Sequence, residues 1–165
     1  GKRCFTEKAL EPSFPVVFID TSNMEATERS LPGSYSYDNP VEAEIVLDIL
    51  DEALRSGINP QDIAVITPYK DQVDLLNHRN KNEELEINTV DGFQGREKEI
   101  IVLSLVRSNP QNNIGFLRDL RRLNVSLTRA KRKLVLIGDS QTIDKHQLYE
   151  DLIKYVKKAG LYYSL

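Results

Sequence analysis

The sequence lacks most of the features that would place a chain of 165 residues in a specialised class of protein. It has a single cysteine, Cys4, which cannot form an internal disulfide, so we expect a reducing, intracellular setting, cytoplasmic or nuclear. Its longest apolar runs, such as 100–103 and 134–137, are far too short to cross a bilayer, and no secretory signal is present. These absences favour one globular domain that needs neither a disulfide nor a membrane.

Nucleotide and metal motifs are also missing. The sequence has no Gly-x-x-x-x-Gly-Lys-Ser/Thr string, so it has no loop of backbone amides with which to wrap phosphates. Asp51 and Glu52 resemble an acidic magnesium-binding box, but they lie inside an amphipathic segment, which favours an exposed helix face. No Cys/His cluster has metal spacing, and the two histidines lie far apart. The sequence therefore predicts no metal site and no catalytic triad.

What the sequence does contain is an alternation of short apolar runs and amphipathic segments. Asn39 and Pro40 are suited to open a helix, and Gly57 is suited to end it. The polar segment 21–39 reads as a long excursion or a mobile insert. Strands that are apolar on both faces and separated by helices predict an α/β fold with a mostly parallel sheet covered by helices. The predicted strands are 15–20, 63–66, 87–90, 99–106 and 134–138, and the predicted helices are 41–55, 71–80, 119–128 and 147–158.

The segment 91–97 is the first candidate functional loop. Its two glycines, three residues apart, allow a tight path or a close backbone approach. Gln94, Arg96 and Glu97 then project near the start of the most hydrophobic predicted strand, which is costly unless they pair with each other or meet a ligand. A structural turn with an Arg–Glu ion pair is the alternative interpretation, and the residues by themselves leave both open.

The second candidate is the basic end of the predicted helix 119–128. The formal net charge is −3, yet segment 118–133 carries seven basic residues against Asp119 alone. Within it, Arg129 follows the helix and precedes a strand, where a fixed guanidinium could donate two hydrogen bonds to a phosphate, as an arginine finger does. The alternative is a basic helix end that interacts with its own dipole.

Three strings together resemble a known family. Segments 66–72, 89–99 and 121–130 look like motifs IV, V and VI of superfamily 1 helicases, in the family's order and with its approximate spacing. The similarity is to the group that includes the nonsense-mediated-decay helicase and the immunoglobulin-mu-binding helicase, and it covers most of 15–160. It implies that residues 1–165 are the second of two RecA-like motor domains, a three-layer sandwich. Gly1 in place of Met agrees with an excised segment.

The resemblance also implies roles for individual residues in nucleotide binding. Arg129 corresponds to the motif VI arginine that reaches the γ-phosphate, and Glu97 to the motif V glutamate near the ribose. Gly95 would supply the close backbone approach beside that glutamate, while Gln94 and Arg96 would couple nucleotide to nucleic acid. ATP and Mg²⁺ would be held mainly by the absent first domain.

Further positions are implied along motifs IV and V. Tyr69 would lie near the nucleotide base, and the hydroxyls of Thr67 and Thr89 would contact the backbone of single-stranded DNA or RNA. The chain departs from some relatives at Val73, where they carry a second arginine; either Arg129 acts alone or another cation, such as Lys70, substitutes.

The implied partners are a single-stranded nucleic acid and the first RecA-like domain of the same protein, with movement 5′ to 3′ along the strand. A rival reading is a non-catalytic RecA-like module that binds nucleic acid or a protein. A nucleotide-binding domain of unrelated α/β type is a third, disfavoured because no Gly-x-Gly-x-x-Gly turn opens a helix. A P-loop in the sequence preceding residue 1 would separate the first two readings.

Overall fold

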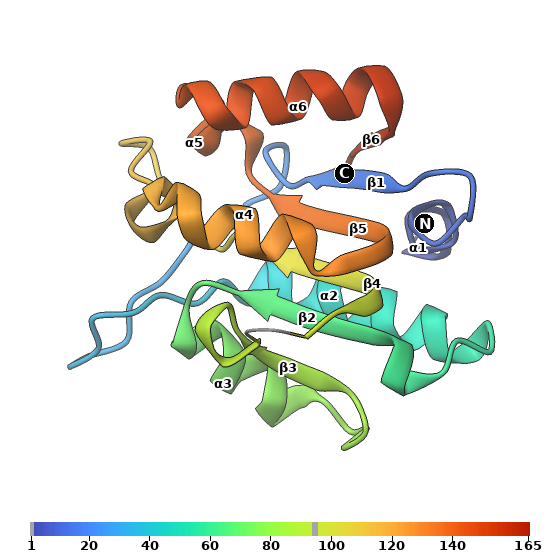
Figure 1. Cartoon of the computed structure of the whole chain (residues 1–165). Helices are drawn as coiled ribbons and strands as arrows, with labels where there is room; N and C mark the ends of the chain where they lie inside the picture. The colour runs from blue at the N-terminus through green and yellow to red at the C-terminus, as the bar shows by residue number, and fades with distance from the viewer. Residues whose placement is uncertain (1, 94–95) are drawn as a thin grey trace.

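The computed structural model describes residues 2–93 and 96–165. Its centre is a six-stranded sheet in the order β3-β2-β4-β5-β1-β6, and each pair of neighbouring strands is parallel (Figure 1). The strands are β1 (Val16–Asp20), β2 (Ile63–Thr67), β3 (Glu86–Thr89), β4 (Lys98–Ser104), β5 (Ala130–Gly138) and β6 (Leu161–Ser164).

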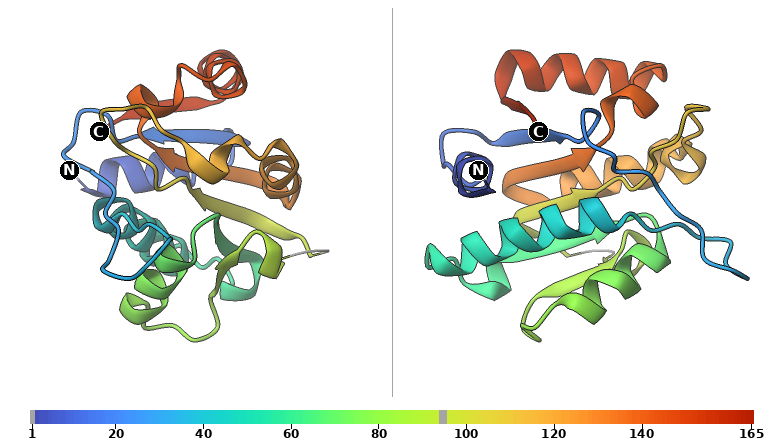
Figure 2. Two further views of the ribbon diagram at one scale, coloured as in Figure 1. Left: turned by 90° about the vertical axis from the view of Figure 1, so that its left-hand side faces the viewer. Right: turned by 180° about the vertical axis from the view of Figure 1, so that it is seen from behind.

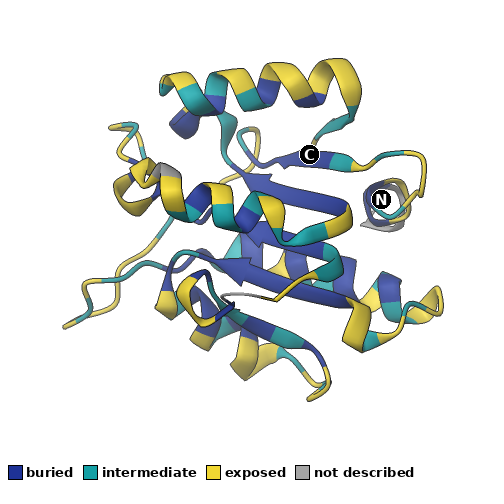
Figure 3. Cartoon of the chain, in the orientation of Figure 1, coloured by how far each residue is buried: buried dark blue, intermediate teal, exposed yellow. Residues whose placement is uncertain are grey.

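Helices cover both faces of this sheet, which makes three layers (Figure 2). One face packs against α1, α2 and α3, and the other against α4, α5 and α6. The strands between them are mostly buried (Figure 3), as expected for a parallel sheet. The helices are α1 (Lys2–Ala9), α2 (Pro40–Arg55), α3 (Lys70–Arg79), α4 (Leu120–Thr128), α5 (Ser140–Ile143) and α6 (Gln147–Ala159), with 3-10 turns η1 (Pro60–Asp62), η2 (Asp91–Phe93) and η3 (Gly115–Arg118).

The predicted α/β sandwich with a parallel sheet is confirmed. Asn39 caps α2 as predicted, since its side-chain Oδ1 accepts a hydrogen bond of 3.1 Å from the backbone N–H of Glu42. Three elements, α1, α5 and β6, were not predicted. The strand predicted from residue 134 begins four residues earlier, because Ala130 and the basic residues 131–133 continue the pairing of β5 with β4.

The polar segment 21–39 is an excursion held by specific contacts. Arg29 and Asp38 form an antiparallel bridge, and their side chains make an ion pair at 2.6 Å. The excursion leaves the sheet after β1 and returns to it at α2, and its tip projects from the body of the molecule (Figure 1). Within residues 2–93 and 96–165, no helix combines the length and the apolar character needed to span a membrane.

Candidate functional site

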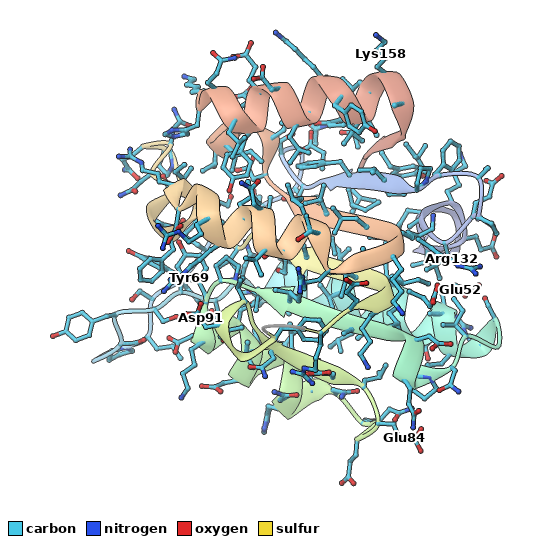
Figure 4. All side chains as sticks on the ribbon, viewed as in Figure 1. Glu52, Tyr69, Glu84, Asp91, Arg132 and Lys158 are labelled. Carbon is cyan, nitrogen blue, oxygen red and sulfur yellow. The ribbon has the colours of Figure 1, made fainter. Side chains whose placement is uncertain are left out.

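The residues that the sequence points to fall on two opposite edges of the sheet. We call the edge where β4 and β5 begin the amino edge, and the edge where β2 and β3 end the carboxyl edge. Glu97 and Arg129 precede β4 and β5, whereas Thr67 and Thr89 end β2 and β3. The seven residues of β4 separate the edges by roughly 20 Å. In Figure 4, Tyr69 lies where the strands end, and Arg132 lies at the opposite edge.

At the amino edge, the backbone of Arg129 is fixed, whereas its guanidinium has little to bind among the described residues. The residue forms the C-cap of α4, and its carbonyl accepts a hydrogen bond of 3.0 Å from the backbone N–H of Lys98. Its Nη2 donates a hydrogen bond of 3.4 Å to the adjacent Thr128 Oγ1. The buried Nε has no hydrogen-bond partner among residues 2–93 and 96–165. An unpaired buried donor is costly, so this guanidinium is suited to an external acceptor.

The same backbone pairing brings Glu97 to this edge. Glu97 directly precedes Lys98, whose N–H bonds to Arg129, so motifs V and VI meet here. The side chain of Glu97 is exposed and makes no hydrogen bond or ion pair with the described residues. An exposed carboxylate beside a half-buried arginine provides an acceptor and a donor for a polar ligand.

Arg96, by contrast, is engaged with the protein itself. Its guanidinium pairs with Glu86, donates a hydrogen bond of 2.9 Å to the carbonyl of Gly92, and lies 4.8 Å from the centre of the Phe93 ring. If segment 91–97 is a structural turn, an Arg–Glu ion pair is expected in it. Arg96 does form an ion pair with a glutamate, but its partner is Glu86 and not Glu97. Gln94 and Gly95, which the sequence also points to, lie outside the described residues.

Thr67 and Thr89 are neighbours at the carboxyl edge. They are register partners at the ends of β2 and β3. The side chain of Thr67 is buried, and its Oγ1 lies 3.5 Å from the backbone N–H of Tyr69. Thr89 is half-buried, and its Oγ1 accepts a hydrogen bond of 3.2 Å from Gly92. The structure thus brings the two hydroxyls together, but both are used in local turns.

Tyr69 does not join Glu97 and Arg129. It sits at the carboxyl edge and is 2% exposed; its hydroxyl donates to the carbonyl of Ile114 and accepts from Arg107, both at 3.3 Å. Burial raises the pKa of the hydroxyl. The structure therefore does not bring Tyr69 together with Glu97 and Arg129, and its place near the nucleotide base stays a prediction.

Arg107 is a carboxyl-edge residue to which the sequence analysis gave no role. Its side chain is 4% exposed, its Nε donates to Glu28 at 2.9 Å, and its guanidinium lies 4.1 Å from the centre of the Tyr37 ring. The adjoining loop passes close by at Gly115, where φ is +49° and a Cβ would overlap the guanidinium. Arg107 thus ties three separate segments together.

A second group missed by sequence reasoning surrounds Glu42. This residue is fully buried in the first turn of α2, and its Oε1 accepts hydrogen bonds from Ser104 Oγ at 2.8 Å and from Val106 N at 3.0 Å. Burial raises the pKa of Glu42 to about 8. Gln72 adds bonds to Ser104 and to the backbone of Asn39. An acidic residue interrupting the apolar face of a helix was the signal that could have revealed it.

These contacts hold an unusual backbone conformation. Val106 has φ of +71°, a region that β-branched residues rarely occupy. Its N–H donates a hydrogen bond to Glu42, and its carbonyl accepts a hydrogen bond of 2.9 Å from Asn39 Nδ2. The network therefore fixes the turn by which β4 leaves the sheet, which positions Arg107. We assign it a structural role.

The described residues show no metal centre. No group of three His, Cys, Asp or Glu side chains in residues 2–93 and 96–165 is placed to hold a metal ion. The amino edge does suit part of a nucleotide, because the unpaired Arg129 donor fits a phosphate and Glu97 fits a hydroxyl. Mg²⁺ bound to such a nucleotide would need ligands from elsewhere.

Comparison with known proteins gives consistent matches. A family described as "AAA domain" matches residues 2–141. DNA-binding protein SMUBP-2 from Mesocricetus auratus is 43% identical over 152 residues, which are 91% of this chain and 15% of that protein. An uncharacterized ATP-dependent helicase from Methanocaldococcus jannaschii is 48% identical over 147 residues, 88% of this chain and 21% of that protein. The chain thus spans about a fifth or less of these relatives.

Two further comparisons agree. A regulator of nonsense transcripts 1 homolog from Neurospora crassa is 44% identical over 155 residues, 88% of this chain and 14% of that protein. The crystal structure of the C-terminal domain of a possible DNA helicase from Lactobacillus plantarum WCFS1 covers 99% of this chain and 94% of its own, with a TM-score of 0.51 and 13% identity, which supports the fold. The chain therefore belongs to the AAA domain family, as a second RecA-like domain of the superfamily 1 helicase type.

Proposed function

We propose that this chain is the C-terminal motor domain of an ATP-dependent DNA or RNA helicase, acting together with a first RecA-like domain. The observation that carries the proposal is the amino edge, where Arg129, whose Nε has no partner among the described residues, and the exposed carboxylate of Glu97 are joined through the Lys98 backbone. The names of the relatives, which include ATP-dependent helicases, support ATP use. We further propose an intracellular setting.

In this function, Arg129 acts as the arginine finger. ATP, when bound with Mg²⁺ mainly by the first domain, supplies the phosphate whose transfer to water is the reaction. Arg129 Nε and Nη2 would donate to the γ-phosphate oxygens and stabilise the charge that develops there. Glu97 would accept hydrogen bonds from the ribose hydroxyls, with Gly95 giving close backbone approach. No second arginine is needed at Val73 in this scheme.

The carboxyl edge would carry the nucleic acid. We propose that the hydroxyls of Thr67 and Thr89 turn to backbone phosphates when a strand binds, with Gln94 and Arg96 linking the two edges. Segment 90–97 supports this link, because it runs from the end of β3 at one edge to the start of β4 at the other. Domain closure over ATP would then shift the grip on the strand and move it, 5′ to 3′ in the full-length protein.

The test is Arg129→Ala in the full-length protein. We expect ATP turnover to fall by about 10³-fold or more, because the finger is lost, while nucleotide binding changes much less. Arg132→Ala is the matched control: it removes an arginine from the same edge, 83% exposed and paired with Glu99 at 2.8 Å, and should leave turnover nearly unchanged. Unchanged turnover in Arg129→Ala would remove that residue from the role.

A further inference from the structure

The tip of the excursion 21–39 presents an aromatic ring to solvent. Tyr35 is 100% exposed, and Phe116, on η3, is 53% exposed. Both line one hollow of about 270 Å³ at the carboxyl edge, whose floor includes Tyr37 and Tyr69. Single exposed aromatic residues are common on protein surfaces, but several rings around one hollow indicate a binding surface.

The base of the excursion is firmly held. Glu28 Oε1 accepts three hydrogen bonds from the segment that follows β4: from Arg107 Nε at 2.9 Å, from Ser108 N at 3.0 Å and from Asn109 Nδ2 at 2.7 Å. These bonds join parts of the chain about 80 residues apart. The excursion is therefore docked onto the body of the domain.

The tip is braced as well. Ser34 Oγ donates to Asp71 Oδ2 at 2.6 Å, and the N–H of Asp71 donates to Ser36 Oγ at 3.2 Å. Asp71 lies in the first turn of α3, so the residues on both sides of Tyr35 are tied to that helix. A ring presented on a fixed backbone loses less conformational freedom when it binds a ligand than one on a mobile loop.

The inner wall of the hollow is aromatic and electrically neutral. The Tyr37 and Tyr69 rings meet edge to face at 5.7 Å, and Phe116 lies 5.7 Å from Tyr69. The one cation in that wall, Arg107, is compensated by Glu28. Flat rings without net charge suit a planar, uncharged ligand group and give no reason for a phosphate to enter.

Positive charge lies beside the hollow instead. The guanidinium of Arg122 is 5.5 Å from the Phe116 ring centre, and Arg118, at the end of η3, and Arg121, in the first turn of α4, are exposed. Arg122 is paired with both Asp91 and Asp119, so the excess positive charge beside the hollow comes from Arg118 and Arg121. Aromatic rings next to basic side chains are the combination by which proteins hold single-stranded nucleic acid, with bases on the rings and phosphates on the cations.

We propose that Tyr35 and Phe116 form a ledge on which a base of single-stranded nucleic acid stacks, its phosphates lying against residues 118–122. This assigns a role in nucleic-acid binding to the excursion 21–39. It rests on the proposed function, in which a nucleic-acid strand passes along the carboxyl edge. The ledge recognises the face of a base, so it is indifferent to sequence.

The test compares two ligands in the full-length protein. Binding of a fluorescently labelled single strand is measured by anisotropy, alongside a strand of equal length in which every nucleotide is abasic. Tyr35→Ala should raise the dissociation constant for the ordinary strand by about 5- to 150-fold, because one stacking contact is lost. The abasic strand should bind the variant and the unaltered protein equally, since it has no base to stack.

Matched variants complete the experiment. Tyr35→Trp should retain binding, and Phe116→Ala should repeat the base-dependent loss. Tyr155→Ala removes another exposed tyrosine, 56% exposed on α6, and should change neither ligand. Equal losses on both strands would overturn the proposal, because stacking requires a base. No loss on either strand would also overturn it, and would leave a protein partner as the candidate occupant of the hollow.

This result is separable from the test of the proposed function. Suppose that Tyr35→Ala weakens binding of the ordinary strand but not of the abasic strand, while Arg129→Ala leaves ATP turnover unchanged. The stacking site would then be supported, and the role of Arg129 as an arginine finger would be rejected. Reduced turnover in Arg129→Ala without any base-dependent loss in Tyr35→Ala would do the reverse.

Discussion

The two edges of the sheet each carry an arginine and a glutamate, but they use them differently. At the carboxyl edge, Arg107 and Glu28 are bonded to each other and nearly fully buried. At the amino edge, neither the buried Nε of Arg129 nor the exposed Glu97 has a partner among the described residues. The same residue types therefore serve as internal bracing at one edge and as free groups at the other.

The difference follows from the cost of burying charge. Removing an arginine from water is tolerated when a carboxylate and further hydrogen bonds replace the water, as happens around Arg107. Arg129 lacks such replacement within the described chain, so its remaining donors are best satisfied by a ligand or a neighbouring domain. Free polar groups on a fixed backbone thus indicate function more strongly than polar residues as such.

The largest expected effect of a substitution that tests this contrast is at the amino edge. Arg129→Lys keeps the charge but loses the planar, two-pronged donor, so ATP turnover in the full-length protein should fall by about 10²- to 10³-fold. Steady-state ATPase measurement checks this, with Arg132→Lys as the control. Full activity in Arg129→Lys would mean that only a positive charge is needed there.

At the carboxyl edge the same kind of change should affect stability. Arg107→Met leaves Glu28 buried without its partner and should lower the free energy of unfolding by about 3 kcal/mol, measured by urea denaturation. The double variant Arg107→Met with Glu28→Gln should recover part of that loss. Arg55→Met breaks a half-exposed pair with Glu52 on α2 and should cost about 0.5 kcal/mol or less.

A third expected effect concerns Glu42 and pH. Burial raises its pKa from 4.5 to about 8, so between these values the folded chain keeps a proton that the unfolded chain releases. Stability contributed by this group is therefore full below about pH 4.5 and falls as pH rises to about 8, by at most about 1.4 kcal/mol per pH unit.

Glu42→Gln should remove that slope, since an amide does not titrate in this range. Unfolding free energies measured from pH 5 to pH 8 would show the unaltered protein losing stability relative to the variant. Glu84→Gln is the control: it makes the same change in net charge at an exposed position, which is labelled in Figure 4. Parallel curves for the Glu42→Gln variant and the unaltered protein would contradict the assignment of a buried, protonated carboxyl.

Sequence patterns were sufficient to predict the strands at the centre of the sheet. Runs such as 100–103 are apolar on both faces, which only a covered parallel strand accommodates well. Edge strand β6, with the residues Leu161–Ser164, is short and only partly buried, so it gave no comparable signal. Its assignment depended on pairing with β1, a contact between residues far apart in the chain.

Among the candidate site residues, the sequence could indicate Arg129 and Glu97 but not their relation to Tyr69. All three stand in recognisable strings, yet Tyr69 follows the end of a strand, whereas Glu97 and Arg129 precede the starts of two others. Which edge each string reaches follows from the direction of its strand. Whether each side chain is buried there is set by packing, as for Tyr69 against Arg107.

By itself the sequence determined the alternation of strands and helices, the parallel sheet, and the placing of an arginine between α4 and β5, because these follow from local periodicity and capping. Only the tertiary structure decided which charged side chains are paired or hydrogen-bonded inside the protein. Glu28 meets Arg107 across 79 residues of chain, and Glu42 meets Ser104 across 62. Such pairings depend on how distant elements pack, and no local pattern encodes them.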